Sequence, residues 1–133
     1  MFECKDAALA KPIARLAKES DPRLQSAALT LALRLPDEAF ATVRPDLAPF
    51  LSAKDEGLGL QAITCFARRK DTQAGPAILR LLKKDRMDPG QAVTVMQALN
   101  ALAGTAFSYD MHHWGPQANG RAIARFEVWL GDR

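Results

Sequence analysis

The chain has 133 residues, of which 48% are hydrophobic and 25% are charged, and its formal net charge is +3. We expect a chain of this size to fold as one globular domain, residues 1–133, and it lacks the apolar run of about 18 residues that a transmembrane helix needs. The amino-terminal segment has no apolar core of signal-peptide length, so the default expectation is a soluble, cytoplasmic protein without a membrane partner; a fragment of a larger protein is the alternative, and its compartment would be unknown.

The first pair of predicted helices covers residues 5–35. Its first helix spans residues 5–19, with Ile13 and Leu16 on the apolar side. Its second helix begins after Asp21, because a short carboxylate at a helix start accepts the unpaired backbone amides. Pro22 then occupies the first turn, where a proline loses no hydrogen bond.

The second pair covers residues 36–70. Residues 37–44 are predicted to form a linker that two prolines bracket and that holds one short helical turn at most. The first helix follows over residues 45–53, and the second begins at Asp55. The apolar residues of this first helix are Leu47, Phe50 and Leu51.

The third pair covers residues 72–103, with a first helix over residues 75–85 and a second that begins at Asp88. Each second helix opens a related segment: DPRLQSAALTLALRL, DEGLGLQAITCFARR and DPGQAVTVMQALNAL. These segments start at residues 21, 55 and 88, hence 34 and 33 residues apart. A period of this length indicates an α-solenoid, in which stacked helix pairs share a continuous apolar core.

The three segments carry apolar residues at matching offsets from the leading aspartate. Positions three, four and seven apart share one face of a helix, so these offsets predict the core. One position departs from the pattern, Gln91 at plus three. The predicted core residues are Leu24 and Leu58 at plus three; Ala28, Ala62 and Val95 at plus seven; Leu31, Cys65 and Ala98 at plus ten; and Ala32, Phe66 and Leu99 at plus eleven.

The pattern Asp-Pro-x-Leu-x-x-Ala-Ala-x-x-Leu-Ala-x-x-Leu from Asp21 to Leu35 resembles the second helix of a HEAT repeat in its bacterial HEAT-like form. The resemblance implies an all-α, right-handed solenoid of three helix pairs that acts as a scaffold or adaptor. Family repeats usually carry an Arg at plus four, where this chain has Gln25, Gly59 and Ala92. We therefore expect no polar ladder between repeats, and a registry that rests on apolar packing alone.

The tail, residues 104–133, departs from the repeat and is predicted to cap the last pair. It resembles the closing segment of bacterial HEAT-like proteins, with Ser108 where that segment more often has Gly. Tyr109 and Asp110 are expected to tie the loop down by hydrogen bonds, and both Trp to seal the core end. The final helix carries one apolar stripe of Ala122, Ile123, Phe126, Trp129 and Leu130.

The exposed side of the three second helices is the candidate binding surface, because these helices line the concave face of such a solenoid. Offsets plus five, plus nine and plus twelve point away from the core. They form a small, neutral, partly apolar groove suited to a protein or peptide partner; alternatively, these are ordinary surface aliphatics. The residues are Ser26, Thr30, Leu33, Leu60, Thr64, Ala67, Val93, Gln97 and Asn100.

Two groups of basic residues could contact phosphates, namely Arg68, Arg69 and Lys70, and Lys83, Lys84 and Arg86. We expect them on opposite edges of the solenoid, as two small patches, and cations at helix ends are also what the helix dipole favours. Nucleic-acid binding, as in the distantly similar HEAT-like alkylpurine DNA glycosylases, is the alternative function. A bilin-lyase-type protein is a further alternative, through a resemblance of repeat type only.

The chain has no phosphate-binding loop, no GxGxxG and no nucleophile with a family signature. Asp110, His112 and His113 suggest a metal site, but adjacent His side chains on regular backbone diverge, and loop packing or solvent exposure is the alternative that we favour. We therefore predict no catalytic residue, no metal and no cofactor, and a non-catalytic function. The sequence does not predict an oligomeric state.

Overall fold

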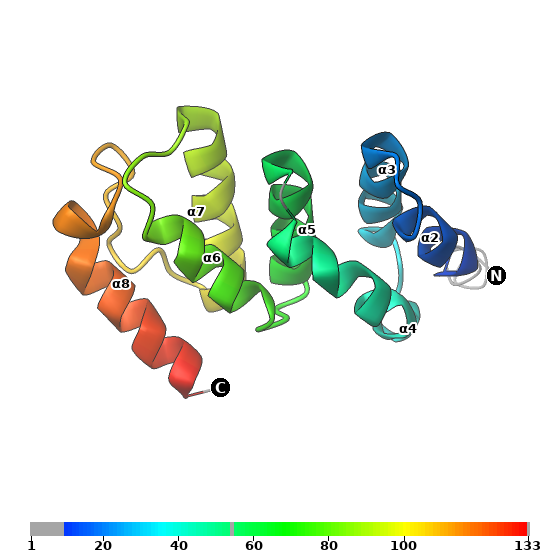
Figure 1. Cartoon of the computed structure of the whole chain (residues 1–133). Helices are drawn as coiled ribbons and strands as arrows, with labels where there is room; N and C mark the ends of the chain where they lie inside the picture. Colours follow the sequence, from blue (N-terminus) through cyan, green and yellow to red (C-terminus); the bar gives the residue numbers. More distant parts are fainter. Residues whose placement is uncertain (1–9, 54, 133) are drawn as a thin grey trace. The chain divides into compact units, whose positions relative to one another are not determined.

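A computed structural model describes residues 10–53 and 55–132 of the chain (Figure 1). These residues form α-helices and one 3-10 helix, with no strand among them, which confirms the predicted all-α class. The part of the first predicted helix that precedes Ala10 lies outside the described residues. The elements are α2 (Ala10–Ala17), α3 (Pro22–Ala32), α4 (Asp37–Leu47), η1 (Ala48–Ser52), α5 (Glu56–Arg68), α6 (Ala74–Leu82), α7 (Pro89–Ala103) and α8 (Pro116–Gly131).

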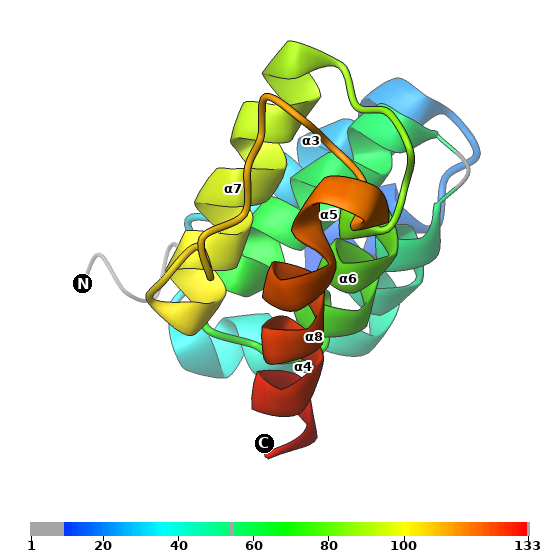
Figure 2. The same cartoon turned by 90° about the vertical axis from the view of Figure 1, so that its left-hand side faces the viewer.

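The chain divides between Cys65 and Phe66 into two compact units, so the division falls within α5. In the first unit, α2 packs against both α3 and α4, and η1 continues directly from α4. In the second unit, α6 packs against both α7 and α8 (Figures 1 and 2). Each unit is therefore built on a helix that has two helical neighbours.

The three second helices, α3, α5 and α7, begin where their leading aspartates predict. The carboxylates accept hydrogen bonds from backbone amides of the first turn, which have no partner within the helix. The bonds run from Arg23 N to Asp21 at 2.9 Å, from Leu58 N to Asp55 at 3.1 Å, and from Gly90 N and Gln91 N to Asp88 at 3.0 and 3.3 Å.

The predicted core positions are buried with one clear exception. All residues at offsets plus seven and plus eleven are buried, as are Cys65 and Ala98 at plus ten, while Leu31 is half-buried. Leu58 at plus three is buried, but Leu24 is 38% exposed, so the prediction for Leu24 is wrong. Leu24 lies in the first turn of α3, and one exposed aliphatic side chain at a helix end costs little.

Residues 37–44 are not a linker, because they form most of α4. The first turn of α4 carries two acidic residues, Asp37 and Glu38, which the helix dipole favours there. One side of the helix is buried and has helical spacing; its residues are Ala39, Phe40, Val43 and Leu47. Pro45 lies inside this helix near its end and is exposed, so its ring interrupts only the last turn. The predicted first helix over residues 45–53 is in fact the end of α4 followed by η1.

The apolar stripe of α8 packs in the second unit. Ala122, Ile123 and Phe126 are buried, while Trp129 and Leu130 are half-buried. The Phe126 and Trp129 rings stack with centroids 5.8 Å apart. A Cβ atom at Gly75 of α6 would overlap Leu130 Cδ2 and lie 3.1 Å from Cδ1. The absence of a side chain at Gly75 therefore allows the close approach of α6 and α8.

Candidate functional site

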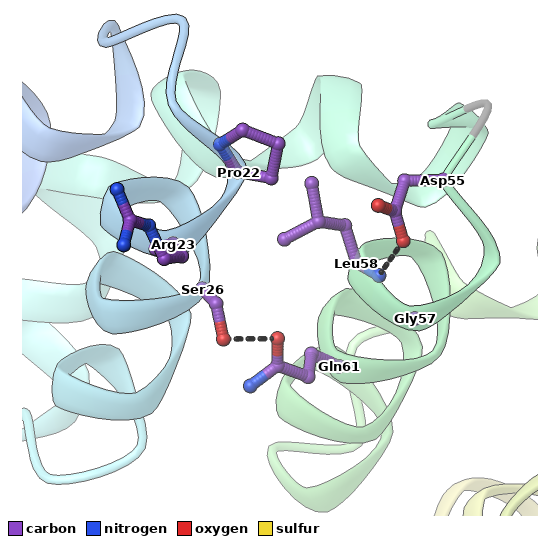
Figure 3. Close-up of a pocket in the computed structure, with 7 residues that line it drawn as sticks. All are labelled: Pro22, Arg23, Ser26, Asp55, Gly57, Leu58 and Gln61. Atoms are coloured by element: carbon purple, nitrogen blue, oxygen red, sulfur yellow. Dashed lines mark hydrogen bonds between the residues drawn. The ribbon is translucent and has the colours of Figure 1, made fainter.

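The first unit contains an open hollow of about 500 Å³ between α3 and the start of α5, here called the α3–α5 hollow (Figure 3). In Figure 3, the Leu58 side chain extends toward α3 below Pro22, and a hydrogen bond joins Ser26 to Gln61. The hollow thus has an apolar part and a polar part. Its lining residues are Pro22, Arg23, Ser26, Asp55, Gly57, Leu58 and Gln61.

A short chain of hydrogen bonds connects α3 to α5 at this hollow. Ser26 Oγ donates to Gln61 Oε1 over 2.7 Å, and Gln61 Nε2 lies 3.4 Å from Thr30 Oγ1, a long bond. Thr30 Oγ1 in turn donates to the backbone oxygen of Ser26 over 3.0 Å. The prediction that registry rests on apolar packing alone is therefore wrong for α3 and α5.

The Gln61 amide keeps one hydrogen available for a ligand. A glutamine amide nitrogen carries two hydrogens, and the described residues offer it one acceptor, Thr30. The unused N–H belongs to a residue that lines the hollow, and such a group can donate to a carbonyl oxygen of a bound chain. Sequence reasoning missed Gln61 because its offset, plus six, was not among those assigned to the exposed face.

Charge at the α3–α5 hollow is nearly balanced. Among the described residues that line it, Arg23 is the only cation, and its guanidinium lies 3.2 Å from a carboxylate oxygen of Asp21. Hydrogen bonds from Arg23 hold the pKa of the Asp21 carboxyl below its ordinary value. Asp55, the lining acid, accepts a hydrogen bond from the backbone of Leu58. A neutral ligand therefore suits this hollow better than a phosphate backbone.

The described residues that line this hollow include no acid–base pair of a catalytic type. The Ser26 hydroxyl donates to an amide oxygen rather than to a histidine or a carboxylate, so nothing there activates it as a nucleophile.

The structure places the residues of the predicted concave face as follows. In the first unit, Ser26, Leu60 and Thr64 are half-buried, while Thr30 and Leu33 are exposed. On α7 of the second unit, Val93, Gln97 and Asn100 are exposed. Ala67 is fully buried, so its assignment to this face is wrong. Ala67 is the next-to-last residue of α5 and follows two other buried residues, Cys65 and Phe66. Since consecutive residues point to different sides of a helix, their common burial means that this end of α5 is enclosed on more than one side.

The loop before α8 is held by Tyr109 and Trp114, as the sequence predicted for Tyr109. The Tyr109 hydroxyl donates to Leu82 O over 2.8 Å and accepts from Gly115 N over 3.1 Å. Trp114 Nε1 donates to Leu81 O over 3.0 Å, and the two rings lie 4.6 Å apart between centroids. Both side chains thereby fix the loop to the end of α6.

Asn119 organises the same loop, and sequence reasoning missed it. Its side chain is buried, accepts from Asp110 N over 2.6 Å, and donates within 3.2 Å of three backbone oxygens. These oxygens belong to Asp110, His113 and Gly115. Asn119 also has non-helical dihedral angles, which mark a kink in α8. The sequence does not predict these contacts, because nothing in the pattern around Asn119 indicates that its side chain reaches the loop before α8.

Asp110 and His113 form a pair, whereas His112 does not join them. Asp110 Oδ2 lies 2.9 Å from His113 Nδ1, and Oδ1 accepts from the backbone of His112. The hydrogen bond from His113 lowers the pKa of the Asp110 carboxyl, so Asp110 helps to tie the loop, as predicted. Across residues 10–53 and 55–132, no three His, Cys, Asp or Glu side chains gather as metal ligands would.

The two basic groups flank α6 in the second unit. Arg68, Arg69 and Lys70 lie at and after the end of α5, and Lys83, Lys84 and Arg86 follow the end of α6. The nine residues of α6 span about 13 Å, which separates the groups. Lys83 also pairs with Glu127 at 3.5 Å. The groups therefore do not merge into one continuous basic surface.

No protein-family model, no curated protein and no solved structure matches the chain. Among the described residues, every helix is too short or too polar to span a bilayer.

Proposed function

We propose that this protein is a non-catalytic interaction module that binds a peptide segment of a partner protein on the exposed side of its second helices. The observation that carries the proposal is the α3–α5 hollow, which combines apolar Pro22 and Leu58 with a Gln61 N–H that has no partner among the described residues. An extended peptide needs this combination, because its side chains seek apolar contact while its backbone needs hydrogen bonds.

The repeats support the same proposal at the level of architecture. Three Asp-headed helices with common buried offsets are what a HEAT-like α-solenoid of three pairs and a terminal cap would contain. We propose that fold, with the right-handed arrangement that such repeats adopt. Within the first unit, the exposed aliphatic residue Leu33, at 38% exposure, would then extend the binding face beyond the hollow.

Nucleic-acid binding has less support. Arg23, the one cation among the described residues that line the α3–α5 hollow, is paired with Asp21, and the two basic groups of the second unit are separated by the length of α6. Binding through phosphates should also fall steeply between about 50 and 200 mM salt, whereas binding of a neutral peptide should not.

The decisive experiment places a large side chain at the hollow and leaves every lining side chain in the sequence. Gly57 lines the hollow in the first turn of α5 and is exposed, and a Cβ atom there would lie 3.2 Å from the cap carboxylate of Asp55. Gly90 has the same place in α7, where a Cβ atom would lie 3.2 Å from the cap carboxylate of Asp88. Gly57→Arg and Gly90→Arg are therefore matched in charge, helix position and local strain, but only Gly57 lines the α3–α5 hollow.

Peptides selected by phage display against the wild-type protein would be measured by fluorescence anisotropy on both variants at about 150 mM salt. We expect peptides with apolar side chains, whose affinity falls at least about tenfold on Gly57→Arg and stays unchanged on Gly90→Arg. If no peptide is enriched, or if both variants bind equally well, the hollow is not the binding site. Circular dichroism of both variants checks that they remain folded.

A further inference from the structure

A second hollow, of about 530 Å³, lies within the second unit between the loop at Phe107 and Ser108 and the first half of α8. We call it the α8 hollow. Two arginines, Arg121 and Arg125, line it from the same helix, and its lining among the described residues includes no aspartate or glutamate. Four residues apart on a helix, their side chains emerge on one face, about 6 Å apart at Cβ.

The two guanidinium groups have no partner among the described residues. Like charges at this spacing destabilise a helix, so the arrangement is unfavourable unless an anion joins it. The nearby acids are already engaged, because Glu127 pairs with Lys83 at 3.5 Å and Asp110 pairs with His113 at 2.9 Å. An anion bound between the two exposed arginines would therefore gain two cations with which no acid among the described residues pairs.

The other lining groups suit a phosphate and the group that carries it. The Ser108 side chain is exposed, and the Ser108 hydroxyl and the Gln117 amide supply hydrogen-bond donors at the rim. Phe107 is half-buried against Phe126, with ring centroids 5.6 Å apart, and offers an aromatic surface beside the arginines. A phosphate monoester carries nearly two negative charges at neutral pH and three acceptor oxygens, which match two guanidinium groups.

We propose that the α8 hollow binds a phosphate monoester between Arg121 and Arg125, independently of the peptide site on α3 and α5. The phosphate belongs either to a phosphorylated side chain of a partner protein or to a free mononucleotide. Both sources present the same dianionic group, and Phe107 would contact the remainder of either one.

The test is a titration of the full chain with inorganic phosphate, followed through backbone amide signals by NMR. Acetate at equal ionic strength controls for a general salt effect. The variant Arg121→Gln/Arg125→Gln removes the proposed site, and Arg86→Gln removes an exposed arginine that does not line the hollow. Arg121→Lys/Arg125→Lys keeps both charges but lacks the planar fork that binds two oxygens at once.

We expect saturable shifts confined to residues 107–125, and an affinity lower by at least about tenfold in Arg121→Gln/Arg125→Gln. Arg86→Gln should bind like the wild type, and the double lysine variant should bind with intermediate affinity. Titration with a phosphoserine peptide and with a mononucleotide then separates the two sources, because the true carrier should bind more tightly than inorganic phosphate.

Two results would overturn the proposal. One is that phosphate shifts no signal in residues 107–125, or that acetate shifts the same signals equally. The other is that Arg86→Gln weakens binding as much as Arg121→Gln/Arg125→Gln does, since the effect would then reflect net charge alone.

Discussion

Replacing Asn119 with alanine should loosen the loop between α7 and α8. The Asn119 side chain is 3% exposed and holds the backbone at Asp110, His113 and Gly115 through four contacts of 2.6–3.2 Å. An amide nitrogen has only two hydrogens, so its three acceptors share them and the side chain makes about three full hydrogen bonds. Alanine at this position removes all of them at once.

The cost follows from the net contribution of each bond. Each of the three hydrogen bonds contributes roughly 0.5–1.5 kcal/mol to the free energy of unfolding. Because water partly hydrates the loop groups that lose their partner, we expect the variant to be less stable by about 2–3 kcal/mol. Alanine normally favours a helix, but the backbone at position 119 is not helical, with φ −121° and ψ 22°. The higher helix propensity of alanine therefore adds little stability at this position. For a chain of this length the change corresponds to a melting temperature lower by about 8–12 °C.

The assay is thermal unfolding followed by circular dichroism and by tryptophan fluorescence. Both tryptophans, Trp114 and Trp129, belong to the same unit as Asn119, so their emission reports on that unit directly. Asn100→Ala is the matched control, because Asn100 is exposed on α7 and its replacement should change stability by less than about 0.5 kcal/mol. Equal melting temperatures for the two variants would refute the role assigned to Asn119.

Ser108→Gly should raise the stability by about 1 kcal/mol, because Ser108 has a φ of 60° that glycine adopts without strain; an unchanged denaturation midpoint would contradict this. Burial raises the pKa of the Tyr109 phenol above its ordinary value of 10.0, so the stability that the neutral phenol contributes should be complete below about pH 10 and lost as the pH rises through the folded-state pKa. Tyr109 is the only tyrosine, so tyrosinate absorbance reports its ionisation directly, and Tyr109→Phe should abolish this alkaline loss. Ala28→Asp should prevent folding, because Ala28 is fully buried and the carboxylate would have no partner; a native circular dichroism spectrum would show that the offset is not a core position.

Local signals were sufficient to predict the second helices. Asp21, Asp55 and Asp88 each accept first-turn amides, and the offsets plus seven and plus eleven are buried in every repeat. Both features depend on residues within one helix, so a linear pattern can reveal them. The same reasoning predicted α8 from its apolar stripe. The sequence did not predict α4, because the two prolines that flank residues 37–44 indicate a linker. The apolar residues between these prolines nevertheless have helical spacing and are buried.

The candidate sites depend on contacts that no linear pattern contains. Ser26 meets Gln61 across two helices, and Asn119 reaches back to the loop at Asp110. Whether a side chain at a helix surface is exposed also depends on its neighbours, which is why Ala67 is buried and Leu24 is not. The sequence by itself determined the three second helices and α8, and most of the buried positions on them. Only the tertiary structure decided which polar groups pair and which surfaces remain open, because pairing and exposure arise from residues far apart in the chain.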